Sequence, residues 1–237
     1  MKKLLYLLLF INFLNATERI ITLSPAINEI AFALGLGDKI IANTEFCDFP
    51  IESKNIQKVG GYGSVSLEKV VNLNPTIILN QDYDKKLNQS LKDLNFKTLV
   101  YKTNSLEDIK FTIKDLGEVF NKKEEAKDLN NQIENSLESL KNIIENQKIL
   151  IVISPQSTLS NQVFVVGNFI YFEDIIKASN NVNAYQSSLK SQPSINSEKL
   201  ITLNPDIIIL LAPYLKDDKE KDDMLNLWKK LPVTASK

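Results

Sequence analysis

The sequence has no histidine, one cysteine and one arginine among its 237 residues. Ser-His-Asp and Cys-His catalysis need an imidazole as general base, so the missing histidine excludes them. The single cysteine, Cys47, excludes an internal disulfide, and without histidine it also excludes the usual zinc sites. Carboxylate pairs of the glycosidase kind remain formally possible, but no spacing favours them. We therefore expect a binding protein rather than an enzyme.

Charge also narrows the range of partners. The net charge is −1, and 27 of the 28 basic residues are lysines. Nothing in their distribution resembles the basic patch of a nucleic-acid-binding protein. We expect no nucleic-acid partner.

The first 16 residues have the pattern of an export signal. Lys2 and Lys3 precede an apolar run from Leu4 to Phe13, and Ala16 offers a small residue at the cut. The run is shorter than the roughly 20 residues that span a bilayer. A buried N-terminal helix or a short membrane anchor are the alternatives. A lipoprotein would need a cysteine at the cut, and Cys47 lies far downstream.

The mature chain begins with alternating strand and helix patterns. Residues 19–23 form a short β-branched run, and residues 26–34 carry apolar side chains at helical spacing after Ser24 and Pro25, which suit a helix start. Residues 39–42 form a second strand pattern. This alternation predicts an α/β fold with a largely parallel sheet.

A twelve-residue pattern occurs twice, as residues 67–78 and again, 130 positions later, as residues 197–208. Both copies contain Glu-Lys, Leu-Asn-Pro and Ile-Ile in the same register, which reads as a helix, a stop and a buried strand. Such junctions are common, so chance recurrence is the alternative. We prefer two related lobes.

Between the copies, residues 122–146 contain no glycine or proline and carry apolar residues at steps of three and four. The pattern predicts one helix of about 36 Å, at about 1.5 Å per residue. It could connect the lobes as a stiff spacer, and a coiled-coil dimer helix is the competing interpretation. Further on, we expect a strand over residues 148–154, a helix over 169–178 and a strand over 206–211. The domains are then an N-terminal α/β lobe (17–120), a bridging helix (121–147) and a C-terminal α/β lobe (148–237).

Several motifs, taken in order, resemble one family. They are Arg19-Ile-Ile-Thr-Leu-Ser-Pro-Ala26 with Asn28-Glu29, Phe46-Cys-Asp-Phe-Pro50, the stretch from Val59 to Glu68, Asn74-Pro75 and Ser197-Glu198. No single motif is specific, but together their order and spacing resemble the periplasmic binding proteins for cobalamin, haem and ferric siderophores.

This resemblance implies the class III periplasmic binding fold, with two Rossmann-like lobes joined by one long helix and the ligand held in the cleft between them. It also implies a periplasmic monomer with no cofactor of its own, which captures a metal chelate and delivers it to an ABC permease in the inner membrane. Family chains carry a further strand and helix after the stretch that matches Trp228 to Pro232. Their absence here indicates a chain shortened at its C-terminus.

By position in the family, Phe46 and Tyr62 would present aromatic faces to the ligand from the first lobe. Phe164 would present an aromatic face from the second lobe, and Gln192 lies in the loop before the second repeat helix, another usual contact. Tyr83 follows a strand whose loop faces the ligand. Each has a structural alternative, because Phe46 or Phe164 could pack in a lobe core. The glycines around Tyr62 make core packing less suitable there. Tyr185 and Tyr214 are possible contacts without a secure alignment.

The ligand class follows from the available side chains. Haem would need a tyrosine as axial ligand, since histidine is absent. Anionic siderophores are often neutralised by several arginines, and Arg19 is the only one. Cobalamin needs mainly apolar and aromatic walls. A corrinoid fits slightly best, with iron chelates close behind.

Glu68 and Glu198 occupy the same place in the two copies of the repeat. The matching acidic residues of the family dock onto arginine pockets of the permease, which implies the same role here. The alternative is a glutamate favoured at a helix N-terminus by the macrodipole. For the whole chain, the rival functions are a sensory or adaptor domain with the same fold and an enzyme that uses carboxylates alone.

Overall fold

The computed structural model describes residues 18–156, 162–187, 189 and 192–236. The expected signal peptide over residues 1–16 lies outside this part of the chain. By contacts the chain forms two compact units, Met1–Val100 and Tyr101–Lys237. Within the part of the chain that the structure describes, no helix is both long and apolar enough to cross a bilayer.

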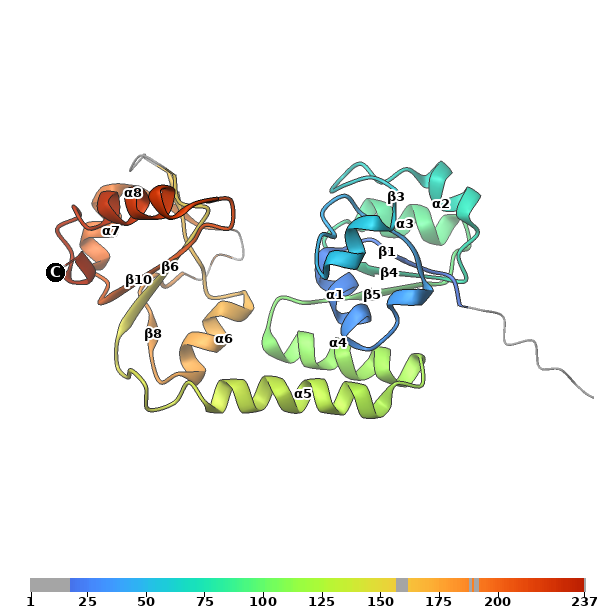
Figure 1. The fold of residues 1–237 in the computed structure, drawn as a ribbon, viewed down its shortest axis with the longest axis horizontal. Helices are drawn as coiled ribbons and strands as arrows, with labels where there is room; N and C mark the ends of the chain where they lie inside the picture. The colour runs from blue at the N-terminus through green and yellow to red at the C-terminus, as the bar shows by residue number, and fades with distance from the viewer. Residues whose placement is uncertain (1–17, 157–161, 188, 190–191, 237) are drawn as a thin grey trace, which may run out of the picture. The chain divides into compact units, whose positions relative to one another are not determined.

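Unit 1 is built on a sheet with the strand order β3-β2-β1-β4-β5 (Figure 1). Neighbouring strands from β1 to β4 pair in parallel, as the alternation of strands and helices predicts. The strands are β1 (Ile20–Thr22), β2 (Ile40–Asn43), β3 (Gln57–Lys58), β4 (Ile77–Gln81) and β5 (Thr98–Tyr101). The helices are α1 (Pro25–Ala33), α2 (Leu67–Leu73) and α3 (Lys85–Asp93), with short 3-10 turns at Gly37–Lys39 and Ile51–Asn55.

Helices cover both faces of the unit 1 sheet. Ile21 and Ile78 belong to a core cluster that also contains Val70 of α2 and Leu91 of α3. On the opposite face the Thr22 hydroxyl donates to Asn28 Oδ1 of α1 at 2.8 Å. Because successive side chains of a strand point to opposite faces, α1 lies on one side of the sheet, and α2 and α3 lie on the other. This is the doubly wound arrangement of Rossmann-like folds.

Unit 2 opens with two packed helices, α4 (Leu106–Val119) and α5 (Lys123–Glu138). A Cβ atom on Gly117 would lie 2.4 Å from the Cβ of Ala126, so glycine permits their close approach. This packing assigns α4 to unit 2. The division therefore falls between Val100 and Tyr101, whereas we expected the N-terminal lobe to extend to residue 120.

Helix α5 is shorter than the sequence pattern predicts. It has 16 residues, or about 24 Å at about 1.5 Å per residue, and ends at Glu138 instead of near residue 146. Asn142 and Asn146 have left-handed backbones, with φ of 62° and 60°. Ile143 and Ile144 are 68% and 48% exposed, so no apolar burial favours continuing the helix.

The remainder of unit 2 holds a parallel sheet of order β10-β6-β8 and a separate antiparallel pair, β7 with β9. Leu150 and Val152 of β6 pack with α7 and α8 on one face, and Ile149 and Ile151 pack with α6 on the other. The strands are β6 (Lys148–Ile153), β7 (Val163–Phe164), β8 (Val182–Asn183), β9 (Ser194–Ile195) and β10 (Ile207–Leu211). The helices are α6 (Tyr171–Ala178), α7 (Ser197–Leu203) and α8 (Asp218–Trp228), with a 3-10 turn at Thr234–Ser236.

The sequence repeat is also a structural repeat. Helices α2 and α7 have equal lengths, and each begins with a side chain that caps it. Each ends at a left-handed asparagine, Asn74 with φ of 45° and Asn204 with φ of 43°. Strands β4 and β10 then follow, each next to the first strand of its own unit. The repeat therefore forms the same helix, left-handed asparagine and strand in each unit, as two related lobes would.

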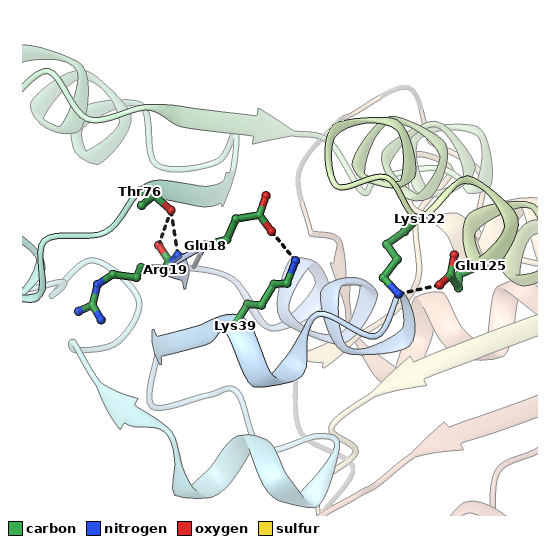
Figure 2. A network of polar contacts seen from close by, with 6 residues as sticks. All are labelled: Glu18, Arg19, Lys39, Thr76, Lys122 and Glu125. Carbon is green, nitrogen blue, oxygen red and sulfur yellow. Dashed lines mark hydrogen bonds and ion pairs between the residues drawn. The ribbon is translucent and has the colours of Figure 1, made fainter. Parts of the chain in front are cut away.

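The structural repeat includes a hydrogen bond at the start of the first strand of each unit, β1 and β6. The backbone N–H of Arg19 donates to Thr76 Oγ1 at 2.9 Å, as Figure 2 shows. At the matching place the backbone N–H of Lys148 donates to Asp206 Oδ2 at 2.8 Å. Figure 2 also shows the nearby Lys39–Glu18 ion pair at the start of unit 1.

Candidate ligand-binding site

The carboxyl ends of the unit 1 strands bring together three residues that the sequence analysis selects. Strand order reverses between β1 and β4, a point where parallel α/β sheets bind ligands. Two side-chain bonds join the loops on either side of this switch point. The Tyr83 hydroxyl donates to Leu23 O at 3.2 Å, and the Ser24 hydroxyl donates to Gln81 Oε1.

Tyr83, Tyr62 and Phe46 form an exposed aromatic cluster at this end of the sheet. The rings of Tyr62 and Tyr83 have centroids 5.2 Å apart and are tilted by 33°. A Cβ atom on Gly61 would lie 3.0 Å from a ring carbon of Phe46, so that ring lies against the backbone next to Tyr62. Phe46 is 59% exposed and Tyr62 is 72% exposed. Core packing is therefore excluded for both, and their faces are available to a ligand.

A glycine turn holds Tyr62 outward. Gly60 and Gly63 have φ of 123° and 68°, a region that L side chains rarely adopt. A Cβ atom on Gly60 would also lie 2.3 Å from the carbonyl oxygen of Ser64. The backbone N–H of Gly61 donates to the Ser64 hydroxyl at 3.2 Å, which closes the turn.

A buried polar network holds the loop that carries Phe46. The side-chain amide of Asn28 donates to the Ser53 hydroxyl at 2.8 Å, and that of Asn43 donates to the same hydroxyl at 2.9 Å. Lys58 Nζ donates to Asn43 Oδ1 at 2.7 Å and to Cys47 O at 3.1 Å. Because buried polar groups are costly to leave unpaired, this network fixes the course of the loop before any ligand arrives.

Partial burial affects the protonation of Tyr83, in the cluster, and of Cys47, in the loop that carries Phe46. It raises the pKa of Tyr83, and the neighbouring Tyr62 and Asp84 add to the effect. Tyr83 therefore keeps its hydroxyl proton at neutral pH and remains a donor. Burial likewise raises the pKa of the Cys47 thiol, so Cys47 stays an unreactive thiol in this loop.

In unit 2 the pairing of β7 with β9 places two further predicted residues near each other. Phe164 is opposite Ser194 in this pair and is 40% exposed, which excludes the core alternative. The side-chain amide of Gln192 donates to Val165 O at 2.6 Å. Gln192 is thus held beside the strand that carries Phe164.

A cavity opens at the carboxyl end of the unit 2 sheet. It has a volume of about 620 Å³ and lies between the loop after β6, Tyr214 and the first turns of α8. The Tyr214 hydroxyl donates to Pro155 O, across the two strands. A smaller cavity next to it is lined by Phe164, Pro155 and Trp228.

The sequence as a whole identifies the family of this two-unit fold. Residues 20–232 match the family of periplasmic binding proteins. The chain belongs to that family.

Two sequence relatives and one solved structure illustrate what this periplasmic binding protein resembles. It is 26% identical over 223 residues to the vitamin B12-binding protein of Vibrio parahaemolyticus, covering 90% of this chain and 79% of that relative. It is 28% identical over 184 residues to the haem uptake protein IsdE of Staphylococcus aureus, covering 75% and 61% of the two chains. The structure of BtuF, a vitamin B12-binding protein of Vibrio cholerae, superposes with a TM-score of 0.76 at 20% identity, covering 92% and 84%. The predicted class III periplasmic binding fold is confirmed.

Sequence reasoning named Tyr214 of this periplasmic binding protein only as a possible contact, without a secure alignment. Tyr214 donates to the loop after β6 as Tyr83 donates to the loop after β1. The repeat offset of 130 places Tyr83 against Pro213 instead, one position away from Tyr214. The signal was therefore present, but a one-residue difference in loop length hid it.

Glu68 and Glu198 lie at the same position of α2 and α7, two residues after the capping residue. Both are exposed. Among the residues that the structure describes, neither carboxylate forms an ion pair. Unit 1 thus presents one carboxylate without an ion pair on α2, and unit 2 presents one on α7.

Proposed function

We propose that this periplasmic binding protein captures a metal chelate, either cobalamin or an iron complex such as haem or a ferric siderophore, and delivers it to an ABC permease. The observation that carries the proposal is the exposed cluster of Phe46, Tyr62 and Tyr83 at the carboxyl ends of parallel strands. Exposed aromatic faces of this kind suit a large, partly apolar ligand. The names of the relatives, which bind vitamin B12 and haem, support the same class.

Phe164 and Gln192 are the proposed ligand contacts of unit 2, and Tyr214 joins them. The signal pattern of residues 1–16 supports export to the periplasm, where a monomer would meet its ligand. Binding without turnover is consistent with a chain that has no histidine to act as general base. The metal would arrive already coordinated in the chelate.

The permease contact is assigned to Glu68 and Glu198. One carboxylate on each related unit suits a partner built from two equivalent halves, because paired rim charges fix register and speed encounter. This part of the proposal rests on the equivalent positions and exposure of the two side chains.

A binding panel tests the ligand class. Mature protein is titrated with cobalamin, haemin, a neutral ferric tris-hydroxamate and a ferric tris-catecholate, and binding is followed by calorimetry and chelate absorbance. We expect saturable binding of one chelate class with a Kd of about 1 µM or tighter, which corresponds to roughly −8 kcal/mol. No binding across the panel would contradict the proposal.

A double variant tests delivery. Glu68→Ala with Glu198→Ala should leave chelate affinity unchanged and weaken association with permease-containing membranes. Glu107→Ala is the matched control, since Glu107 is also exposed and also lies two residues after a capping residue, Ser105 of α4. Equal docking by the double variant and by the control would remove the assigned role.

A further inference from the structure

The loops around the aromatic cluster carry negative charge and no positive charge. The loops that follow β1, β2, β3 and β4 cover residues 23–24, 44–50, 59–66 and 82–84. They contain no lysine or arginine, although the chain has 28 such residues. They do contain four carboxylates, namely Glu45, Asp48, Asp82 and Asp84.

Glu45 is part of the aromatic surface itself. A Cβ atom on Gly61 would lie 3.4 Å from Glu45 Oε2 and 3.0 Å from the ring of Phe46. The carboxylate and the ring therefore lie side by side over the same stretch of backbone, next to Tyr62. The side chain is exposed, so a ligand on the Phe46 ring would meet its charge.

Asp48 and Glu29 extend the negative charge around the loop that carries Phe46. Asp48 lies two residues after Phe46, and Asn28, which precedes Glu29 in α1, donates to Phe49 O of the same loop at 3.3 Å. Partial burial raises the pKa of Glu29, and repulsion from Asp48 raises it further. Both side chains are exposed.

Four cations of unit 1 bond to other groups of the unit or line a different groove. Lys58 Nζ is bonded to Asn43 Oδ1, Cys47 O and Ser53 O, and Lys69 Nζ donates to Lys58 O at 3.4 Å. Lys85 lines a groove between α3 and β5 together with Asp82, Phe96 and Val100, so its charge faces that of Asp82. The Arg19 guanidinium bonds to Leu73 O and Asn74 O.

The cavity of unit 2 adds no surplus of positive charge. Its carboxylates Glu220 and Asp223 are matched by neighbours, since Glu220 Oε2 accepts from the backbone N–H of Lys216 at 2.8 Å and Asp223 pairs with Lys219 at 2.8 Å.

We infer that Glu45, with Asp48 and Glu29, makes this surface select metal chelates that carry no net negative charge. The inference rests on the proposed function and narrows it. A chelate bordered by amides or hydroxamates, or one with a net positive charge, suits the surface because its outer N–H groups or its charge are attracted by the carboxylates. A polyanionic chelate is repelled by the same carboxylates, and the four loops around the aromatic cluster supply no lysine or arginine to replace its lost hydration.

Two pairs of ligands with the same metal test the inference. The first pair is a corrinoid with intact peripheral amides and the same corrinoid with those amides hydrolysed to carboxylates. The second pair is a neutral ferric tris-hydroxamate and a ferric tris-catecholate. In whichever pair binds, the uncharged chelate should bind at least about tenfold more tightly than the anionic one. High salt should reduce this ratio of affinities, because salt screens the repulsion.

The double variant Glu45→Gln with Asp48→Asn should reduce the ratio of the two affinities. It should bind the anionic chelate more tightly, while its affinity for the uncharged chelate stays within about twofold of that of the unchanged protein. Asp38→Asn is the matched control, because exposed Asp38 precedes β2 and so lies at the opposite end of the sheet. Equal or tighter binding of the anionic member by the unchanged protein would overturn the inference alone. Binding of no member of either pair would overturn the inference, and it would overturn the proposed function as well only if haemin also fails to bind.

Discussion

Arg19 is the only arginine, and its side chain is used within unit 1. The guanidinium bonds to Leu73 O at 2.6 Å and to Asn74 O at 3.3 Å, at the carboxyl end of α2. A cation there satisfies open carbonyls and complements the helix dipole. In unit 2 the Lys148 ammonium donates to Leu203 O at 3.3 Å, at the end of α7. Arg19 is therefore a helix-capping residue at the amino edge of the sheet, remote from the aromatic cluster.

Replacing Arg19 should separate stability from binding. Arg19→Ala should lower the free energy of unfolding by about 1–2 kcal/mol, because two carbonyls lose a charged donor. Arg19→Lys should recover part of this loss. Urea denaturation measures the free energy of unfolding, and chelate titration measures the affinity. The affinity should stay within about twofold of that of the unchanged protein. A large loss of affinity with unchanged stability would instead make Arg19 a ligand contact.

Glu29 should produce a measurable pH dependence of stability. Its folded-state pKa is raised by burial and by Asp48, so its proton stabilises the fold below the ordinary pKa, and that stabilisation is lost as pH rises through the raised value. Glu29→Gln should therefore be more stable than the unchanged protein at pH 7, by a few tenths of a kcal/mol for this exposed group. The difference should shrink toward pH 4. Urea denaturation at both pH values checks the sign, and a less stable variant at pH 7 would refute it.

At the scale of elements, the repeat shows which parts of the fold a sequence pattern predicts well. Glu-Lys, Leu-Asn-Pro and Ile-Ile occur at one offset, and the structure turns each copy into a capped helix, a left-handed asparagine and a strand. These features depend on local chemistry, so local sequence suffices. The end of α5 depends on whether Ile143 and Ile144 find apolar partners, and both are exposed. Spacing alone cannot report that, and the predicted helix was therefore too long.

The two left-handed asparagines should respond differently to the same change. Asn74→Gly should leave stability within about 0.5 kcal/mol, because glycine adopts this backbone readily. Asn204→Gly should cost about 1 kcal/mol more, because Asn204 Oδ1 accepts hydrogen bonds from Thr234 N at 2.9 Å and Thr234 Oγ1 at 3.2 Å. Urea denaturation of the two variants provides the comparison. Equal effects would show that the anchor to Thr234 contributes nothing.

At the scale of the whole molecule, each unit has a tyrosine that bonds to the loop after the first strand of its own sheet, Tyr83 in unit 1 and Tyr214 in unit 2. The sequence predicts the order of strands and helices, since hydrophobic period and capping residues are local. It also selects Phe46, Tyr62 and Tyr83, which the structure brings to one end of a sheet. It could not show that Lys58 is occupied by Asn43 and Cys47, because such contacts join segments distant in sequence.

The most direct test of the account is a titration of mature protein and of the double variant Phe46→Ala with Tyr62→Ala, using the chelate that binds best in the panel. Both side chains are exposed, so their removal should change the free energy of unfolding by no more than about 0.5 kcal/mol each. We predict that chelate affinity falls by about 100-fold, since each aromatic face contributes about 1–2 kcal/mol. An affinity that is unchanged in a stably folded double variant would contradict the account.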